Sequence, residues 1–389
     1  MMSLDQPKPV LPRDARLKTG LASLTFDLPD ELEASAPPEA RGLSRDGVRL
    51  MVSYRDDDRI IHRQFTDLPD LISPGDLLVI NTSGTLNAAL TAAVIDHDEA
   101  FELHLSTHLP DGQWIVEVRI PVENGTTTAY YEAQPGWELR LPAGGLATLI
   151  SPVSTHHEKP HLWRADLHLP LDPLEYLARH GFPIRYSYVK HTWPNSTYQT
   201  VYHTEMGSAE MPSAGRAFSE AVITRLVARG VQIAPLILHT GVASLADDEL
   251  PHEEYYRVPE STAALVNAAR GERRRVIAVG TTVVRALETV RDPSGTVHGG
   301  EGWTRLIVSP QTGIRTVDGL ITGFHEPEST HLAILSALVS EHHLKLAYGA
   351  ALAERYLWHE FGDLHLILPG EGTAKTNYTA KPQRSQRVL

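Results

Sequence analysis

Residues 276–288 have the composition of a ligand-binding junction between a strand and a helix. An apolar run ends at Gly280, which permits a tight turn, and Thr281 and Thr282, which follow, can cap a helix. Arg285 comes one helical turn later and can point to the same place. Because a helix start leaves N–H groups unpaired and carries a partial positive charge, it attracts carboxylates and other anions. Taken alone, the segment fits an ordinary capped helix equally well.

A second junction of this kind spans residues 319–330, where an apolar strand precedes a turn that contains His325. Residues 211–218 are mostly small and can let a ligand approach the backbone, although a plain connecting loop is the commoner interpretation. His239 ends the apolar run 231–239, where a structural histidine is as common as a catalytic one. Enzymes of the α/β class often bind ligands at the carboxyl ends of strands. Two such junctions in one chain favour a binding site.

The elements that would position these residues change character along the chain. Residues 77–169 show short runs with period-two alternation between Gly, Pro and Asp turns, which is typical of a small antiparallel barrel. Helical patterns and buried strands alternate after it. We predict an α/β fold, with a discontinuous α/β main domain at residues 1–82 and 171–369 and an inserted antiparallel β-barrel domain at residues 83–170. Residues 370–389 are polar and are expected to form a disordered tail.

The composition excludes several kinds of site. The chain has 389 residues, of which 42% are hydrophobic, and this is enough for two domains with a sizeable core. It has no cysteine, which excludes disulfides, thiolate nucleophiles, iron–sulfur clusters and cysteine-ligated zinc. No apolar run approaches the roughly eighteen residues of a membrane helix, and the N-terminal sequence lacks the apolar stretch of a signal peptide. We expect a cytoplasmic protein that does not contact membranes.

Twenty histidines and a formal net charge of −13 bear on metals and nucleic acids. His104 and His108 are four residues apart, but they lie in a strand pattern without the helical geometry of a zinc motif. We therefore expect no metal site. The negative charge disfavours a general nucleic-acid-binding surface, because phosphate contacts need Lys and Arg, but it is compatible with a local basic patch.

Eight short motifs, taken together and in order, give the chain a resemblance to a known family. They are Phe26-Asp-Leu-Pro, Phe65-Thr-Asp-Leu, Pro74-Gly-Asp-Leu-Leu-Val-Ile-Asn81-Thr, Tyr198-Gln-Thr-Val-Tyr202, Pro212-Ser-Ala-Gly215, Leu238-His239-x-Gly241, Val279-Gly-Thr-Thr-x-x-Arg285-x-Leu-Glu288 and Phe324-His325-x-Pro-Glu328-Ser-Thr330. The chain resembles the S-adenosylmethionine:tRNA ribosyltransferase-isomerases of queuosine biosynthesis. The motifs cover most of the chain, and their combination is specific although each one is short.

The resemblance implies both a fold and a reaction. The fold is a β-barrel inserted into an α/β domain, which agrees with the pattern described above. The reaction joins the ribosyl moiety of S-adenosylmethionine to a 7-aminomethyl-7-deazaguanine in tRNA, gives epoxyqueuosine and releases adenine and methionine. S-Adenosylmethionine is then a substrate, tRNA is a partner, and neither a prosthetic group nor a metal is required.

The resemblance also implies the residues of the site. A base must take a proton from the carbon beside the sulfonium, and His239, His325 and Glu328 are the candidates for proton handling. The junction that ends in Arg285 is expected to hold the methionine carboxylate. The predicted substrate-binding residues are Asn81, Thr82, Tyr198, Gln199, Tyr202, Pro212, Ser213, Ala214, Gly215, Gly241, Gly280, Thr281, Thr282, Arg285 and Ser329.

Some motif positions depart from the pattern of the family. Residues 195–197 lack the arginine that usually precedes Tyr198, Ser83 stands in place of another arginine, and Arg216-Ala217 replaces Leu-His. In an acidic chain, these losses weaken the expectation of tRNA more than that of the fold or of S-adenosylmethionine. The alternatives are a paralogue that uses S-adenosylmethionine on a small-molecule acceptor and a catalytically silent binding protein. The oligomeric state is open, with a monomer favoured.

Overall fold

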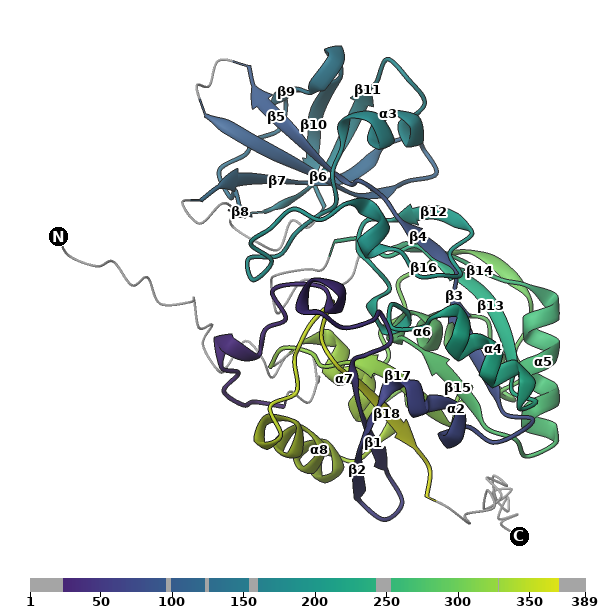
Figure 1. Cartoon of the computed structure of the whole chain (residues 1–389). Helices are drawn as coiled ribbons and strands as arrows, with labels where there is room; N and C mark the ends of the chain where they lie inside the picture. Colours follow the sequence, from purple (N-terminus) through teal and green to yellow (C-terminus); the bar gives the residue numbers. More distant parts are fainter. Residues whose placement is uncertain are drawn as a thin grey trace, which may run out of the picture.

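A nine-stranded sheet forms the larger part of the molecule (Figure 1), with the strand order β16-β14-β13-β3-β15-β17-β18-β1-β2. The structure is a computed structural model that describes residues 24–95, 99–122, 126–153, 160–242, 253–327 and 329–370. The strands of this sheet are β1 (Arg49–Tyr54), β2 (Arg59–Gln64), β3 (Leu77–Asn81), β13 (Gln232–Leu238), β14 (Glu254–Val258), β15 (Val276–Val279), β16 (Gly300–Thr304), β17 (Gly319–Gly323) and β18 (Leu364–Leu368). Four adjacent strands, β13, β3, β15 and β17, are parallel.

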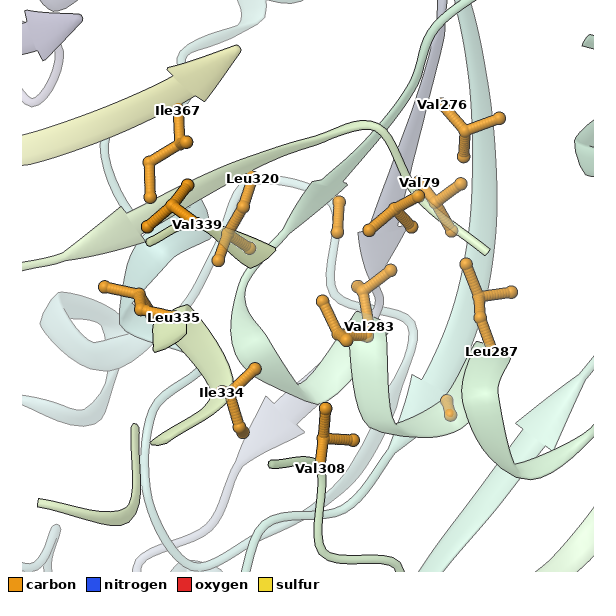
Figure 2. Close-up of a cluster of buried hydrophobic side chains, with 14 of the residues drawn as sticks. Val79, Val276, Val283, Leu287, Val308, Leu320, Ile334, Leu335, Val339 and Ile367 are labelled. Atoms are coloured by element: carbon orange, nitrogen blue, oxygen red, sulfur yellow. The ribbon is translucent and has the colours of Figure 1, made fainter. Parts of the chain in front are cut away.

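These central strands are buried on both faces, as expected for a parallel sheet that is covered by helices. In β3, Leu77 and Val79 belong to one apolar core, whereas Leu78 and Ile80 belong to another. Figure 2 shows Val79 in the first core together with Val283 of a covering helix. The helices of the first core are α5 (Glu260–Gly271), α6 (Thr281–Thr289), α7 (Thr330–Leu338) and α8 (Glu341–Ala353), and those of the second are α2 (Leu68–Leu71) and α4 (Glu220–Ala228).

A second, antiparallel sheet closes into a six-stranded barrel (Figure 1). Its order is β11-β10-β9-β5-β6-β7, and β11 pairs again with β7, while β8 (Thr127–Ala129) extends β7. The barrel strands are β5 (Ala89–Val94), β6 (Ala100–His108), β7 (Trp114–Pro121), β9 (Glu138–Arg140), β10 (Leu146–Pro152) and β11 (Leu162–His168). Alternate residues such as Leu103 and Leu105 of β6 fill its interior. Helix α3 (Pro173–His180) adds Tyr176 to the same core.

The barrel is inserted between two neighbouring strands of the large sheet. The chain leaves after β3 through β4 (Ser83–Thr85) and returns before β13 through β12 (Glu205–Ser208), and β4 and β12 pair in parallel. The predicted α/β fold with an inserted barrel is therefore confirmed. The predicted domain limits stay a prediction, and residues 371–389 of the predicted tail lie outside the described residues. Short 3-10 helices complete the chain, namely η1 (Asp30–Leu32), η2 (Pro38–Arg41), η3 (Phe65–Asp67), η4 (Pro142–Gly144), η5 (Asn195–Tyr198) and η6 (Ser213–Gly215).

Helices α4 and α6 begin in different ways. Ser219 accepts a hydrogen bond from the N–H of Val222, so it caps α4. The threonines at the start of α6 do not act in this way, because Gly280 is the N-cap and no side chain caps the helix. Gly280 has a φ of +94°, a conformation that other residues rarely adopt. In the described ranges, no helix is long and apolar enough to cross a membrane.

Candidate functional site

The carboxyl ends of the four parallel strands bring together motifs that lie far apart in the sequence. Asn81 ends β3, His239 follows β13, Gly280 follows β15 and His325 lies two residues after β17. Since these strands are adjacent, the motifs line a single edge of the sheet. This edge is where ligands bind in open α/β sheets.

The side chain of Asn81 forms hydrogen bonds that connect β3, β13 and α6 at this edge. Its Nδ2 donates to the carbonyl of Leu238 at 2.8 Å and to Oγ1 of Thr282 at 3.3 Å, and its Oδ1 accepts from the N–H groups of Leu238 and Ser83. Thr82 donates from Oγ1 to the carbonyl of Leu236 at 3.3 Å. Both side chains therefore join β3 to its neighbours, and Asn81 also reaches the start of α6.

His239 lies in a polar cluster at the end of β13. Its Nδ1 shares a hydrogen bond of 2.8 Å with Oγ of Ser83, which shares another of 2.6 Å with Ser208, and its Nε2 is 3.8 Å from a carboxylate oxygen of Glu205. Burial lowers the pKa of His239, and the Glu205 carboxylate opposes this shift. A Cβ on Gly207 would lie 2.4 Å from the imidazole, so a larger residue here would force the ring of His239 to move. His239 is thus a positioned imidazole that is neutral at pH 7.

Arg285 is engaged in a buried ion pair. Its Nη1 donates to Oε2 of Glu254, and its Nε donates to the carbonyl of Leu306 at 3.2 Å. The other carboxylate oxygen of Glu254 accepts from the N–H of Gly241 at 2.9 Å. Nη2 of Arg285 is buried and has no hydrogen-bond partner among the described residues. Its two N–H groups can therefore donate to a ligand.

Two imidazoles stack beside the turn after β17, where His325 lies in the turn and His331 in the first turn of α7. The rings of His325 and His331 are 4.3 Å apart and nearly parallel, and Nε2 of His325 shares a hydrogen bond of 2.8 Å with Thr322. Burial, followed by the charges of neighbouring histidines, holds the pKa of His325 well below its usual value. Burial and the nearby Arg285 lower the pKa of His331 to about 4. Both rings are therefore neutral at pH 7.

Ser329 comes directly before α7. Like Nη2 of Arg285, its hydroxyl oxygen is a buried polar atom without a partner among the described residues. This oxygen does not cap α7, although the residue is the N-cap. Glu328, the third candidate for proton handling, lies outside the described residues.

Comparison with known proteins identifies the family. A model of the queuosine biosynthesis protein family matches residues 21–367. The chain belongs to this family. It is 37% identical to an S-adenosylmethionine:tRNA ribosyltransferase-isomerase of Symbiobacterium thermophilum, over 90% of this chain and 99% of the relative. It is 35% identical to the protein of the same name from Moorella thermoacetica, over 88% and 98%.

A solved structure is also similar to this member of the queuosine biosynthesis family. It is an S-adenosylmethionine tRNA ribosyltransferase from Thermotoga maritima, and it is 29% identical. The match covers 88% of this chain and 99% of the other, with a TM-score of 0.48.

The small-residue motif of the family lies beside the start of α6. A Cβ on Gly280 would be 3.6 Å from the Cβ of Ala214, so η6, which follows Pro212 and contains Ser213, Ala214 and Gly215, borders the same junction through Ala214. A Cβ on Gly215 would be 2.0 Å from the hydroxyl of Tyr202, so this tyrosine packs directly against Gly215. Burial raises the pKa of Tyr202. Residues 212–215 thus lie between the start of α6, which Ala214 contacts at Gly280, and the protonated phenol of Tyr202, which contacts Gly215.

The motif that ends in Tyr202 also supports the backbone of β4 through Gln199. Oε1 of Gln199 accepts from the N–H of Thr85 at 3.0 Å, and its Nε2 donates to the Thr85 carbonyl at 2.7 Å. The side chain of Gln199 therefore pairs with the backbone of Thr85 in the way that a neighbouring strand would. The hydroxyl of Tyr198 is buried and has no partner within the described residues, and burial raises its pKa.

Several polar residues of the site carry no motif in the sequence. They are Glu205, Ser208, Glu254 and His331, together with Ser83, which was noted only as a lost arginine. They come from β4, β12, β14 and α7, and they meet the motif residues only in the folded chain. His331 alone had a local signal, since it is a potential proton donor or acceptor immediately after the Ser329-Thr330 motif.

Proposed function

We propose that the chain is an S-adenosylmethionine:tRNA ribosyltransferase-isomerase. It transfers the ribosyl moiety of S-adenosylmethionine to a 7-aminomethyl-7-deazaguanine in tRNA, forms epoxyqueuosine and releases adenine and methionine. S-Adenosylmethionine is a substrate, and no prosthetic group takes part. Membership of the queuosine biosynthesis family and the names of its relatives support this activity.

One observation supports the sheet edge as the place of binding. Nη2 of Arg285 and Oγ of Ser329 are both buried and without partners among the described residues. Both belong to family motifs, and Arg285 is close enough to His331, two residues after Ser329, to lower the pKa of that histidine. A buried polar group without a partner costs free energy, which a ligand with acceptor oxygens removes. The methionine carboxylate of S-adenosylmethionine supplies such oxygens.

The chemistry also needs a base near the sulfonium, whose positive charge acidifies the adjacent carbon. His325 and His239 are both supported as proton acceptors, because burial keeps their imidazoles neutral. Glu328 stays a candidate from its motif. An active His325→Ala variant with an unchanged pH–rate profile would remove His325 from this role.

The remaining assignments concern the setting of the reaction. We propose that the protein acts in the cytoplasm, where tRNA is its substrate, and that it is a monomer. The large exposed apolar side chains among the described residues come from different elements, for example Leu174 of α3, Val227 of α4 and Leu346 of α8, which supports a monomer. We likewise propose that the boundaries between the α/β domain and the barrel domain lie at residues 82/83 and 170/171.

Adenine release tests the proposed function. The protein is incubated with S-adenosylmethionine, with and without tRNA that carries the aminomethyl-deazaguanine, and adenine and methionine are detected by chromatography. Release that depends on this tRNA is expected. Binding of S-adenosylmethionine without release would favour a paralogue with another acceptor, and the absence of both would favour a silent binding protein. Binding to tRNA should weaken as salt rises, because phosphate contacts release counterions.

A further inference from the structure

Three side chains that are not among the predicted site residues offer ligand atoms to one point. Nε2 of His359 is 3.5 Å from Oε1 of Glu33 and 3.9 Å from Oε1 of Glu326, and all three ligand atoms lie within 4.8 Å of one another. We propose that Glu33, Glu326 and His359 bind a divalent first-row transition-metal ion, with Zn²⁺ as the expected occupant. This site differs from the expectation of no metal that was based on the histidine spacings, and it does not depend on the proposed reaction.

The environment of His359 is the strongest indication that a ligand binds here. Its side chain is only 8% exposed, and Nε2 has no hydrogen-bond partner in the described parts of the chain, although it faces two carboxylates. The ring of Tyr188 stacks on the imidazole at 4.2 Å with an angle of 12°, which fixes the plane of the ring. His359 also has a φ of +71°, a costly conformation for a residue other than glycine. A buried imidazole nitrogen is thus held without a partner at the meeting point of two acids.

The backbone holds the three ligands in place before any ion binds. The N–H of Trp358 donates to the carbonyl of Leu32 at 2.8 Å, and the N–H of Ala34 donates to the carbonyl of Trp358 at 3.2 Å. The N–H of His359 donates to the carbonyl of Phe324 at 3.3 Å. These bonds place residues 32–34, 324–326 and 358–359 side by side. The site therefore belongs to three packed segments and not to one loose loop.

The chemistry of the donors selects the ion. One imidazole nitrogen with two carboxylate oxygens suits Zn²⁺ better than Mg²⁺ or Ca²⁺, which prefer oxygen alone. Ligands bound to Zn²⁺ at about 2.0–2.2 Å in tetrahedral geometry lie roughly 3.4 Å apart, so only small side-chain movements are needed. Two carboxylates balance the charge of the ion. Glu326 is 62% exposed and gives the ion access from solvent.

Binding of Zn²⁺ to the full chain, freed of metal by a chelator, tests the proposal. Isothermal titration calorimetry should show one Zn²⁺ site per chain, and Zn²⁺ should raise Tm because it binds only the folded state. We expect Glu326→Gln and His359→Gln to weaken this binding at least tenfold. Glu326→Gln alters an exposed side chain, so it tests the site even where His359→Gln disturbs folding.

A surface histidine provides the control for nonspecific binding. His342 is 72% exposed, and His342→Gln should leave the affinity for Zn²⁺ unchanged. No saturable binding of Zn²⁺, or equal affinity in the wild type and the Glu326→Gln variant, would overturn the proposal. Both readouts are independent of S-adenosylmethionine and tRNA, so failure of this proposal is distinguishable from failure of the proposed enzymatic activity.

Discussion

Arg285 and Glu254 form a buried ion pair that crosses the carboxyl edge of the large sheet. Arg285 comes from α6 and Glu254 from β14, and the carboxylate of Glu254 also accepts from the N–H of Gly241. The pair therefore connects two family motifs that are 44 residues apart in the sequence, from Gly241 to Arg285. It fixes the guanidinium and leaves Nη2 without a partner among the described residues, so that this nitrogen can donate to a ligand.

Removing either partner of this pair should destabilise the fold. Arg285→Gln leaves the buried carboxylate of Glu254 without its counter-charge, at a cost of about 3 kcal/mol. Glu254→Gln should cost a similar amount for the converse reason. The double variant should be more stable than the sum of the two single effects predicts, by at least about 1 kcal/mol. Urea denaturation of the four proteins measures this coupling, and additive effects would contradict it.

Arg285→Lys separates the ion pair from ligand binding. Lysine keeps a positive charge for Glu254 but lacks the second donor of the guanidinium fork. We expect a stability close to that of the wild type and about tenfold weaker binding of S-adenosylmethionine, which corresponds to about 1.4 kcal/mol. Arg305→Lys is the control, because Arg305 is 71% exposed. Calorimetric titration with S-adenosylmethionine checks both variants, and equal affinities would exclude a direct contact with Arg285.

Gly207→Ala should displace the imidazole of His239. The added methyl group would lie 2.4 Å from the ring, which must then move away from Ser83. We expect a loss of adenine release of at least tenfold, accompanied by a lower Tm. Gly349→Ala is the matched control: no atom lies within 4 Å of its Cβ, and the change should stabilise α8 by up to about 1 kcal/mol. Wild-type activity in Gly207→Ala would show that the position of His239 does not matter.

Glu360→Gln should stabilise the protein in a pH-dependent way. Burial and the nearby Glu210 raise the pKa of Glu360 to about 8, while Arg216 opposes the shift. Between pH 4.5 and 8, the unfolded chain loses this proton and the folded chain keeps it, so the stability contributed by Glu360 falls as pH rises. The variant removes this loss, and its Tm should exceed that of the wild type at pH 9 but not at pH 4.5. A Tm difference that is equal at both pH values would contradict the assignment.

The sequence predicts those parts of the fold that depend on local pattern. Alternation with a period of two identified the barrel strands, and β15 was predicted at its observed limits, because four apolar residues end at a glycine. The cap of α6 was mispredicted for a local reason. Gly280, with its φ of +94°, takes the N-cap position, while Oγ1 of Thr282 accepts from Asn81.

Contacts between distant strands could not be predicted from local patterns. Glu254 has no motif around it, and its importance emerges only when β14 brings it to Arg285. Gln199 was predicted to bind substrate, and the structure shows that it pairs with the backbone of Thr85. Its role toward a ligand stays a prediction. Side-chain type and spacing thus locate the edge of the site, but they do not tell which donors are already used within the fold.

The most direct test of the proposed function is the identity of the nucleoside formed in tRNA. tRNA that carries 7-aminomethyl-7-deazaguanine is incubated with the protein and S-adenosylmethionine, digested to nucleosides and analysed by mass spectrometry. We predict conversion to epoxyqueuosine, with one adenine released per nucleoside formed. Unchanged 7-aminomethyl-7-deazaguanosine in the presence of folded protein and bound S-adenosylmethionine would contradict it.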